Sequence, residues 1–100
     1  MPDGKYRLGD FEVIVTNGVC RNAAGLLAGS TLTLDRALRN IVNLGVPLPD
    51  TVRMLTLNPA SLLGIEFKKG SLRGGADADI LLLDESLHLG GVWARGVALN

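Results

Sequence analysis

The dipeptide Asn17-Gly18 constrains the fold of this chain most, because it stands between two stretches rich in β-branched and apolar residues. Asn-Gly favours a type I′ turn, in which both central residues have positive φ, and this turn joins adjacent antiparallel strands. Apolar and polar residues alternate within 5–16, as expected of a strand with one mixed face. We therefore predict a strand over 5–16, a return strand over 19–22 and a further turn at 23–25, which together form an N-terminal hairpin or small meander.

Two to three helices are predicted in the middle of the chain. Apolar residues at helical spacing form a stripe within 34–44, and Gly45 suits the left-handed position that ends a helix. Pro49 suits the first turn of a second helix. That helix is expected to end at Asn58, because the residue before a proline disfavours α geometry. Asn58 would then cap a short third helix over 59–63.

The last third of the chain returns to strand patterns. The apolar run Ile80–Leu83 predicts a buried strand, and residues 87–95 predict a second strand that is bulged at Gly90-Gly91. A turn at Arg95-Gly96 leads into a third strand from residue 97. The order of strands, helices and strands predicts an α+β fold.

Charge and composition exclude several classes of function. Lys plus Arg is 10 and Asp plus Glu is 10, a balance that argues against a nucleic-acid-binding or polybasic membrane-surface protein. No apolar stretch approaches the ~20 residues of a membrane helix, and no signal peptide is visible. We therefore expect a cytoplasmic protein that does not engage a membrane. A single cysteine and a single histidine exclude an internal disulfide and a multi-histidine metal site.

The most site-like segment is the small-residue loop that contains Gly29 and Ser30. Exposed N–H groups at the start of a helix can hold a phosphate or another polar ligand, and small residues allow close approach. The simpler alternative is that Ser30, Thr31 or Thr33 caps the following helix. This loop is not a P-loop, because the Gly-Lys-Ser/Thr ending is missing.

Other reactive side chains have a structural interpretation beside a functional one. His88 lies on a predicted strand with no second histidine, and Cys20 has no nearby base that would activate it. Asp77 and Asp79 are spaced to share a strand face, where they are either a carboxylate pair or solvated turn residues. We find no complete catalytic set, so we assign no catalytic and no metal-binding residue to this chain.

The segment 27–40 resembles a signature of the N-acetylglucosamine-6-phosphate deacetylases, which belong to the amidohydrolase superfamily. It reads Leu-Ala-Gly-Ser-Thr-Leu-Thr-Leu-Asp-Arg-Ala-Leu-Arg-Asn. Further stretches resemble the same family in the same order: 2–9, 53–60, Leu63-Gly64, 69–72 and 78–84. The last two occur across amidohydrolases, whereas the loop and its helix narrow the resemblance to the deacetylases. The chain departs from the usual tail in having Gly74-Gly75-Ala76 where Pro-Gly-Lys is common.

The resemblance implies that the chain is the C-terminal part of a longer enzyme with a metal-dependent (β/α)₈ barrel and a small β-sandwich. Residues 1–66 would supply the hairpin and final helices of the barrel, and residues 67–100 would supply strands of the sandwich. The divalent metal, zinc or iron, and the catalytic aspartate would be held by segments upstream of residue 1. The chain alone is therefore expected to be inactive and, with unpaired strand edges, to be marginal in stability or prone to aggregation.

The resemblance also implies a function. The full enzyme would hydrolyse the N-acetyl amide of N-acetylglucosamine 6-phosphate, giving glucosamine 6-phosphate and acetate, and would be a homodimer. Leu27, Ala28, Gly29 and Ser30 would contact the amino-sugar phosphate. Two alternatives stay open: a free-standing α+β module that binds an anion or a partner, and a piece of another amidohydrolase such as a hydantoinase or deaminase.

Overall fold

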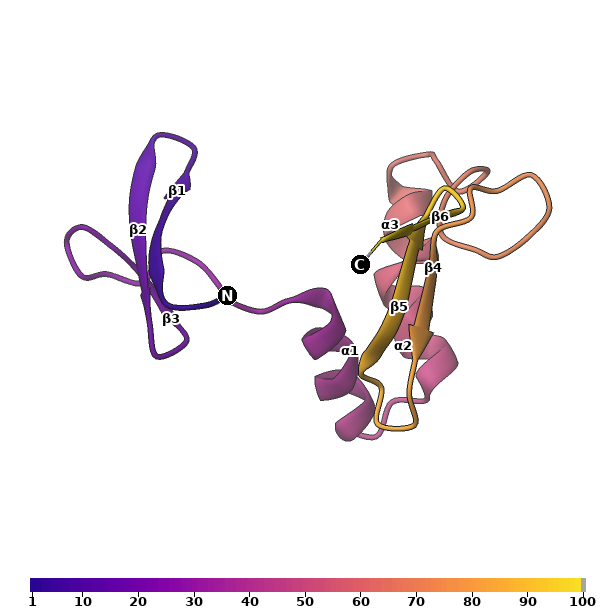
Figure 1. Cartoon of the computed structure of the whole chain (residues 1–100), viewed down its shortest axis with the longest axis horizontal. Coiled ribbons are helices and arrows are strands. Elements are labelled where there is room, and N and C mark those ends of the chain that lie inside the picture. The colour runs from indigo at the N-terminus through magenta and orange to yellow at the C-terminus, as the bar shows by residue number, and fades with distance from the viewer. Residues whose placement is uncertain (100) are drawn as a thin grey trace. The chain divides into compact units, whose positions relative to one another are not determined.

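A computed structural model describes residues 1–99, and the chain divides into two compact units. The first unit spans Met1–Thr33 and holds one antiparallel sheet, whereas the second begins at Leu34 and holds three helices and a second antiparallel sheet (Figure 1). The predicted α+β fold, with strands before and after the helices, is confirmed.

The first sheet consists of β1 (Gly4–Leu8), β2 (Phe11–Thr16) and β3 (Val19–Asn22), in that spatial order. The turn at Asn17-Gly18 and the return strand are confirmed, and Thr16 pairs with Val19 across the turn. The single strand predicted over 5–16 is wrong, because a turn at Gly9-Asp10 divides it into β1 and β2. This two-residue turn pairs Leu8 with Phe11, so polar and apolar residues keep alternating through the hairpin and hide the break.

One face of this sheet carries the core of the first unit. Val13, Val15 and Cys20 are buried, and Tyr6 and Ala28 pack against them. These residues share a face because side chains two apart on a strand point to the same side and because Val15 pairs with Cys20. The loop that contains Ala28 therefore contributes to the core of the sheet.

Three helices open the second unit: α1 (Leu34–Asn43), α2 (Leu48–Leu55) and α3 (Leu57–Leu62). Gly45 follows α1 with φ +101, as predicted for a residue that ends a helix. The predicted end of α2 at Asn58 and the predicted cap role of Asn58 are both wrong, because α2 ends at Leu55 and Asn58 lies within α3. Pro59 is the third residue of α3, where a backbone N–H would have no helical partner in any case.

The second sheet consists of β4 (Ile80–Leu83), β5 (Leu89–Ala94) and β6 (Val97–Leu99), again antiparallel and in chain order. The predicted bulge is confirmed, since Leu82 pairs with Gly91 while Leu83 pairs with Leu89, which leaves Gly90 as the extra residue. The strand predicted from residue 87 begins two residues later. Leu87 has φ +64 and belongs to the turn between β4 and β5.

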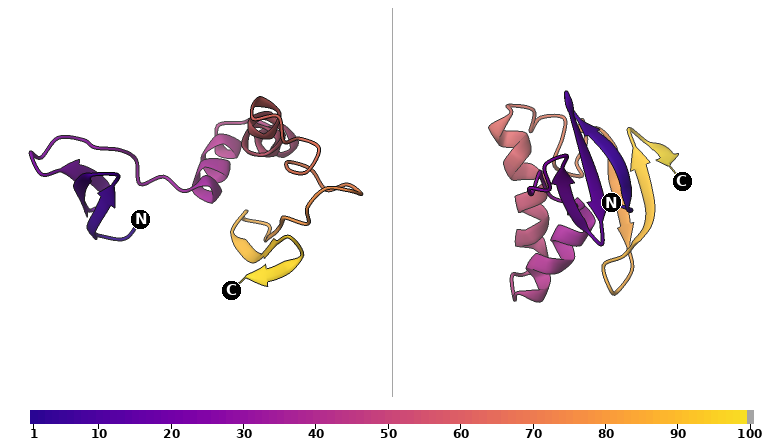
Figure 2. Two further views of the ribbon diagram at one scale, coloured as in Figure 1. Left: turned by 90° about the horizontal axis from the view of Figure 1, so that it is seen from above. Right: turned by 90° about the vertical axis from the view of Figure 1, so that its left-hand side faces the viewer.

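The helices lie on one side of this sheet (Figure 2), yet the prediction of a buried β4 is wrong. Ile80, Leu81 and Leu82 are 37%, 57% and 57% exposed. An apolar run is typical of a strand covered on both faces, and no described segment covers β4 in that way. Among residues 1–99, no helix is long and apolar enough to cross a membrane.

Candidate functional site

The loop predicted to contact a ligand, residues 27–30, lies beside the first sheet. Leu27 is 71% exposed, whereas Ala28 is half-buried against the core of Val13, Val15 and Cys20. Gly29 has φ +149, and a Cβ built there would lie 3.7 Å from Leu8 Cδ1. The loop thus exposes one large apolar side chain and, at Gly29, backbone with no side chain above it.

Three contacts attach this loop to the sheet. Leu27 forms a β-bridge with Arg21, and the Ala28 N–H donates to the carbonyl of Cys20 at 3.0 Å. The Thr31 hydroxyl donates to the carbonyl of Gly18 at 2.9 Å. Because these contacts are spaced along the loop, its backbone is fixed on both sides of Gly29.

The expectation that Ser30 or Thr31 caps the following helix is wrong. The Ser30 hydroxyl accepts a hydrogen bond from the Leu32 N–H at 3.0 Å, and the Thr31 hydroxyl is used at Gly18. Helix α1 begins at Leu34, so residues 31–33 separate Ser30 from the helix. The hydroxyls of Ser30 and Thr31 are therefore used within the first unit, at the Leu32 N–H and the Gly18 carbonyl.

The turn that precedes the loop is held by two residues at the end of β3, which the sequence pattern had not indicated. Asn22 Oδ1 accepts hydrogen bonds from the N–H groups of Ala24 and Leu26, both at 3.0 Å. Arg21 Nη1 donates to the carbonyl of Gly25 at 2.9 Å. Asn at the end of a strand before a small-residue turn is a typical Asx-turn signal and would have identified Asn22.

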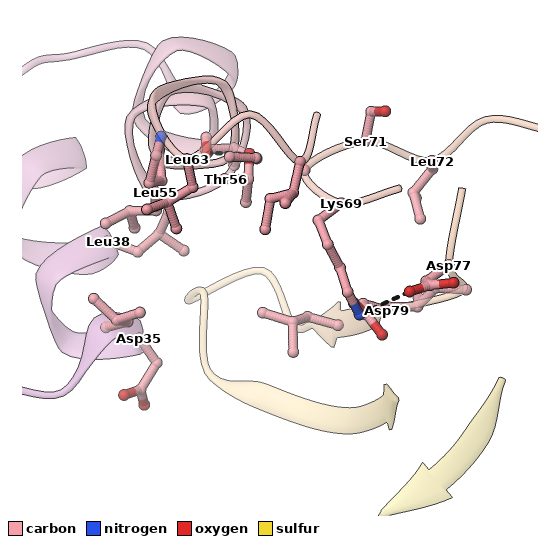
Figure 3. Close-up of a pocket in the computed structure, with 18 of the residues that line it drawn as sticks. Asp35, Leu38, Leu55, Thr56, Leu63, Lys69, Ser71, Leu72, Asp77 and Asp79 are labelled. Atoms are coloured by element: carbon pink, nitrogen blue, oxygen red, sulfur yellow. Dashed lines mark hydrogen bonds and ion pairs between the residues drawn. The ribbon is translucent and has the colours of Figure 1, made fainter. Parts of the chain in front are cut away.

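Asp77 and Asp79 do come together, but with a lysine between them rather than as a bare carboxylate pair. Lys69 Nζ lies 3.0 Å from Asp77 Oδ2 and 2.6 Å from Asp79 Oδ2 (Figure 3). Asp79 Oδ1 also accepts the N–H of Arg95 at 2.9 Å. The hydrogen bond from Lys69 and then that from the Arg95 backbone lower the pKa of Asp79, and the two carboxylates raise the pKa of Lys69.

His88 and Asp84 belong to the turn between β4 and β5. Asp84 Oδ1 accepts the backbone N–H groups of His88 and Ser86, both at 2.9 Å, and these bonds lower the pKa of Asp84. The Arg39 side chain, from α1, donates to the carbonyl of Leu87 at 3.2 Å. The predicted strand position of His88 is wrong. Its exposed ring lies 3.9 Å from the Asp84 carboxylate, and we find no catalytic partner for it among the described residues.

A hollow of about 600 Å³ lies in the second unit, lined by helix residues and by β4. Its wall is mainly apolar, with Leu38 and Leu55 from the helices and Leu81 from the sheet, and Lys69 and Asp79 stand among its polar residues (Figure 3). The amine of Lys69 in this hollow is engaged by two carboxylates.

Metal ligation is not supported by the side chains of residues 1–99, where no three His, Cys, Asp or Glu residues could hold an ion together. The acidic groups that lie near one another in the second unit are already bound by Lys69 and by backbone amides.

Comparison with known proteins gives a consistent result. The profile of the amidohydrolase family matches residues 3–97. The chain is 45% identical over 97 residues to the N-acetylgalactosamine-6-phosphate deacetylase of Escherichia coli O157:H7, covering 96% of this chain and 26% of that protein. It is 39% identical over 97 residues to the N-acetylglucosamine-6-phosphate deacetylase of Vibrio furnissii, covering 96% of this chain and 24% of that protein.

The fold gives the same result as the sequence. The crystal structure of N-acetylglucosamine-6-phosphate deacetylase from Pasteurella multocida matches with a TM-score of 0.81 at 27% identity, covering 95% of this chain and 25% of that one. The chain thus spans about a quarter of the length of these three proteins, and 58% of a shorter relative from Escherichia coli K12.

Proposed function

The chain belongs to the amidohydrolase family, and we propose that it is the C-terminal portion of an N-acetylglucosamine-6-phosphate deacetylase. The complete enzyme would hydrolyse the N-acetyl amide and release glucosamine 6-phosphate and acetate. The observation that carries this proposal is the agreement of sequence and fold with such deacetylases over nearly the whole chain.

We assign the chain's two regions to the architecture that the resemblance implies. Residues 1–66 would complete a (β/α)₈ barrel, and residues 67–100 would form part of a composite β-sandwich. The exposed apolar residues of β4 support this assignment, because a sandwich buries one face of each sheet. The complete enzyme would be cytoplasmic and homodimeric.

Within this enzyme, Leu27, Ala28, Gly29 and Ser30 would border the sugar. The exposed Leu27 side chain offers an apolar contact, and the bare backbone at Gly29 allows a sugar to approach closely. The Ser30 hydroxyl accepts from Leu32 and keeps its own proton available for donation. These groups bind and orient the phosphosugar, and bond cleavage is assigned to residues outside this chain.

The metal of the complete enzyme, zinc or iron, does not fit the residues described here. Asp77 and Asp79 are neutralised by Lys69, and Asp84 is bound by two backbone amides. We therefore place its ligands in the remaining polypeptide and derive no step through the metal.

Exchange of the matched segment tests the proposal. Residues 1–99 of this chain would replace the 97-residue match in the Escherichia coli O157:H7 deacetylase, and acetate release from phosphorylated N-acetyl sugars would be measured. We expect the hybrid to be active and its Gly29→Val variant to lose substrate binding. Gly75→Val is the matched control, because Gly75 also has a positive φ, +91, and a Cβ there meets nothing within 4 Å.

An inactive but folded hybrid would overturn the assignment. The isolated chain serves as the second arm, in which we expect no acetate release. Saturable shifts of the Gly29 and Ser30 amides on phosphosugar titration of a well-folded monomer would instead favour a free-standing anion-binding module.

A second candidate differs only in the configuration of the sugar. A relative that is 45% identical is named for the galactosamine substrate, whereas one that is 39% identical is named for the glucosamine substrate. Measuring kcat/KM of the hybrid with both epimers, beside the parent enzyme, separates the two. A shift of preference toward the glucosamine substrate after exchange supports the first candidate, and an unchanged preference for the galactosamine substrate supports the second.

A further inference from the structure

We propose that Asn22 is a positioning residue for the sugar-binding loop, an inference that rests on the proposed role of residues 27–30. Asn22 touches no part of a ligand in this proposal. Its side chain holds the turn that carries the chain from β3 into the loop, and it thereby sets where Leu27 and Ala28 lie.

Hydrogen bonds of Asn22 close this turn. A single oxygen, Asn22 Oδ1, accepts from the N–H groups of Ala24 and Leu26, each at 3.0 Å. The Asn22 backbone N–H donates to the Leu26 carbonyl at 2.8 Å, and its carbonyl accepts from Gly25 at 3.0 Å. Asn22 therefore supplies an end of four hydrogen bonds that close residues 22–26 into one compact turn.

The turn is connected to the loop through the Arg21–Leu27 bridge. The Asn22 to Leu26 bond and the Ala28 to Cys20 bond are the two bonds that flank the Arg21–Leu27 bridge. A turn of different shape would change the register of this bridge. Because side chains alternate along an extended backbone, a register change of one residue would turn Leu27 to the opposite side and remove Ala28 from the core.

The other contacts that hold the turn and the loop are less specific to the turn. Arg21 reaches the Gly25 carbonyl through a long, exposed side chain, and Thr31 attaches the far end of the loop to Gly18. Neither contact satisfies the N–H groups of Ala24 and Leu26. Loss of the Asn22 oxygen would leave both exposed donors to water and would free the turn to adopt other conformations.

The test uses Asn22→Ala, which removes the shared acceptor, and Asn22→Asp, which keeps an acceptor oxygen at the same place. Asn43→Ala is the control, because Asn43 is an exposed asparagine at the end of α1. In the hybrid deacetylase, we expect Asn22→Ala to raise KM for the phosphosugar about tenfold with kcat changed less than about threefold, since the loop binds and the chemistry lies elsewhere. We expect Asn22→Asp and the control to stay within about twofold of the parent values.

Amide hydrogen exchange of the 100-residue chain gives a readout that needs no substrate. In Asn22→Ala, we expect faster exchange at Ala24, Leu26 and Ala28, with the amides that pair β1 with β2 unchanged. Retained protection at Ala28 would overturn the inference, as would an unchanged KM. Loss of protection throughout β1–β3 would also overturn it, because Asn22 would then stabilise the whole sheet rather than position the loop. An inactive parent hybrid would count against the proposed function alone, since the exchange result would still decide the role of Asn22.

Discussion

Gly70 shows how a single residue decides whether the helices and the following turn fit together. It has φ +96, and a Cβ built there would lie 3.0 Å from both Ala60 Cβ and Leu57 Cα and 3.1 Å from the Thr56 carbonyl oxygen. Such distances are closer than normal van der Waals contact. A Cβ at this position would force its neighbours at the start of α3 to move, and the positive φ would add backbone strain.

We predict that Gly70→Ala destabilises the second unit by roughly 2–4 kcal/mol, from overpacking added to backbone strain. The matched control is Gly75→Ala, whose φ is +91 but whose Cβ meets nothing within 4 Å, so it should cost only about 1 kcal/mol. Urea unfolding followed through Trp93, the single tryptophan, measures both variants. Equal losses of unfolding free energy in the two variants would show that the contact of residue 70 with α3 contributes nothing to stability.

A second single residue, Asp79, makes the stability of the chain depend on pH. Its pKa is lowered first by the hydrogen bond from Lys69 and then by the Arg95 N–H, so the folded state favours the charged carboxylate. The stabilisation is present above the unfolded pKa of about 3.9 and is lost as the pH falls through the lower folded pKa.

We therefore predict that the urea midpoint of the parent chain falls between about pH 5 and pH 2, and that Asp79→Asn weakens this dependence. The difference between the two proteins should be largest near neutral pH and should shrink with acidification. Asp84→Asn is a useful comparison, because the pKa of Asp84 is also lowered, but by backbone N–H groups of its own turn. A difference that stays constant with pH would contradict this account of Asp79.

At the scale of elements, β5 combines a bulge with a close contact between a glycine and a ring. Gly91 and Trp93 lie on one face of the strand, and a Cβ at Gly91 would come within 2.9 Å of the Trp93 ring. The neighbouring Gly90 is the bulged residue, and a Cβ there would meet only the Leu82 carbonyl oxygen at 3.6 Å.

We predict that Gly91→Ala displaces the Trp93 ring, shifting its fluorescence maximum and reducing its near-ultraviolet circular dichroism. Because the ring is a movable side chain, the stability loss should be modest, about 1 kcal/mol. Gly90→Ala should leave both spectra unchanged, since 3.6 Å is ordinary van der Waals contact. Identical spectra for the two variants would rule out the packing of Trp93 over Gly91.

The elements also show how far the sequence could predict this structure. Signals confined to a few neighbouring residues, such as Asn17-Gly18 and the Gly90 bulge, gave correct predictions. The Gly9-Asp10 turn was missed because alternation continues across a two-residue hairpin. The Lys69–Asp79 pair could not be predicted, because ten residues separate the partners and only the fold brings them together.

Some features of the candidate site could likewise be predicted from the sequence, and others could not. The loop was found through its resemblance to the deacetylases, and its assigned residues remain a prediction. Its support by Asn22 is local and was available as an Asx-turn signal, whereas the Thr31 hydroxyl was expected to cap a helix and instead reaches Gly18, thirteen residues away. Spacing alone does not distinguish these two uses of a threonine.

At the scale of the whole molecule, the second unit lacks a closed core. Leu38 and Ala60 are its buried apolar residues among those described, and the hollow of about 600 Å³ lies between elements that carry many exposed leucines. Exposed apolar side chains and unpaired strand edges both favour association.

We predict that the isolated chain self-associates and that Leu82→Lys reduces this association. Leu82 lies in β4 and is 57% exposed, whereas the control position Leu44 is 80% exposed but lies just beyond the end of α1. Light scattering over a concentration series compares Leu82→Lys and the control variant Leu44→Lys with the parent chain. A parent chain that stays a monodisperse monomer over the whole concentration series would contradict the prediction.

The single cysteine of the chain lies in the core that Ala28 helps to cover, and only 3% of Cys20 is exposed. The alkylation rate of this thiol therefore reports on opening of the first unit. A thiol-specific alkylating reagent can reach the sulfur only when the packing of Val13, Val15, Tyr6 and Ala28 around it opens, so the rate of labelling reports how often the core of the first unit opens.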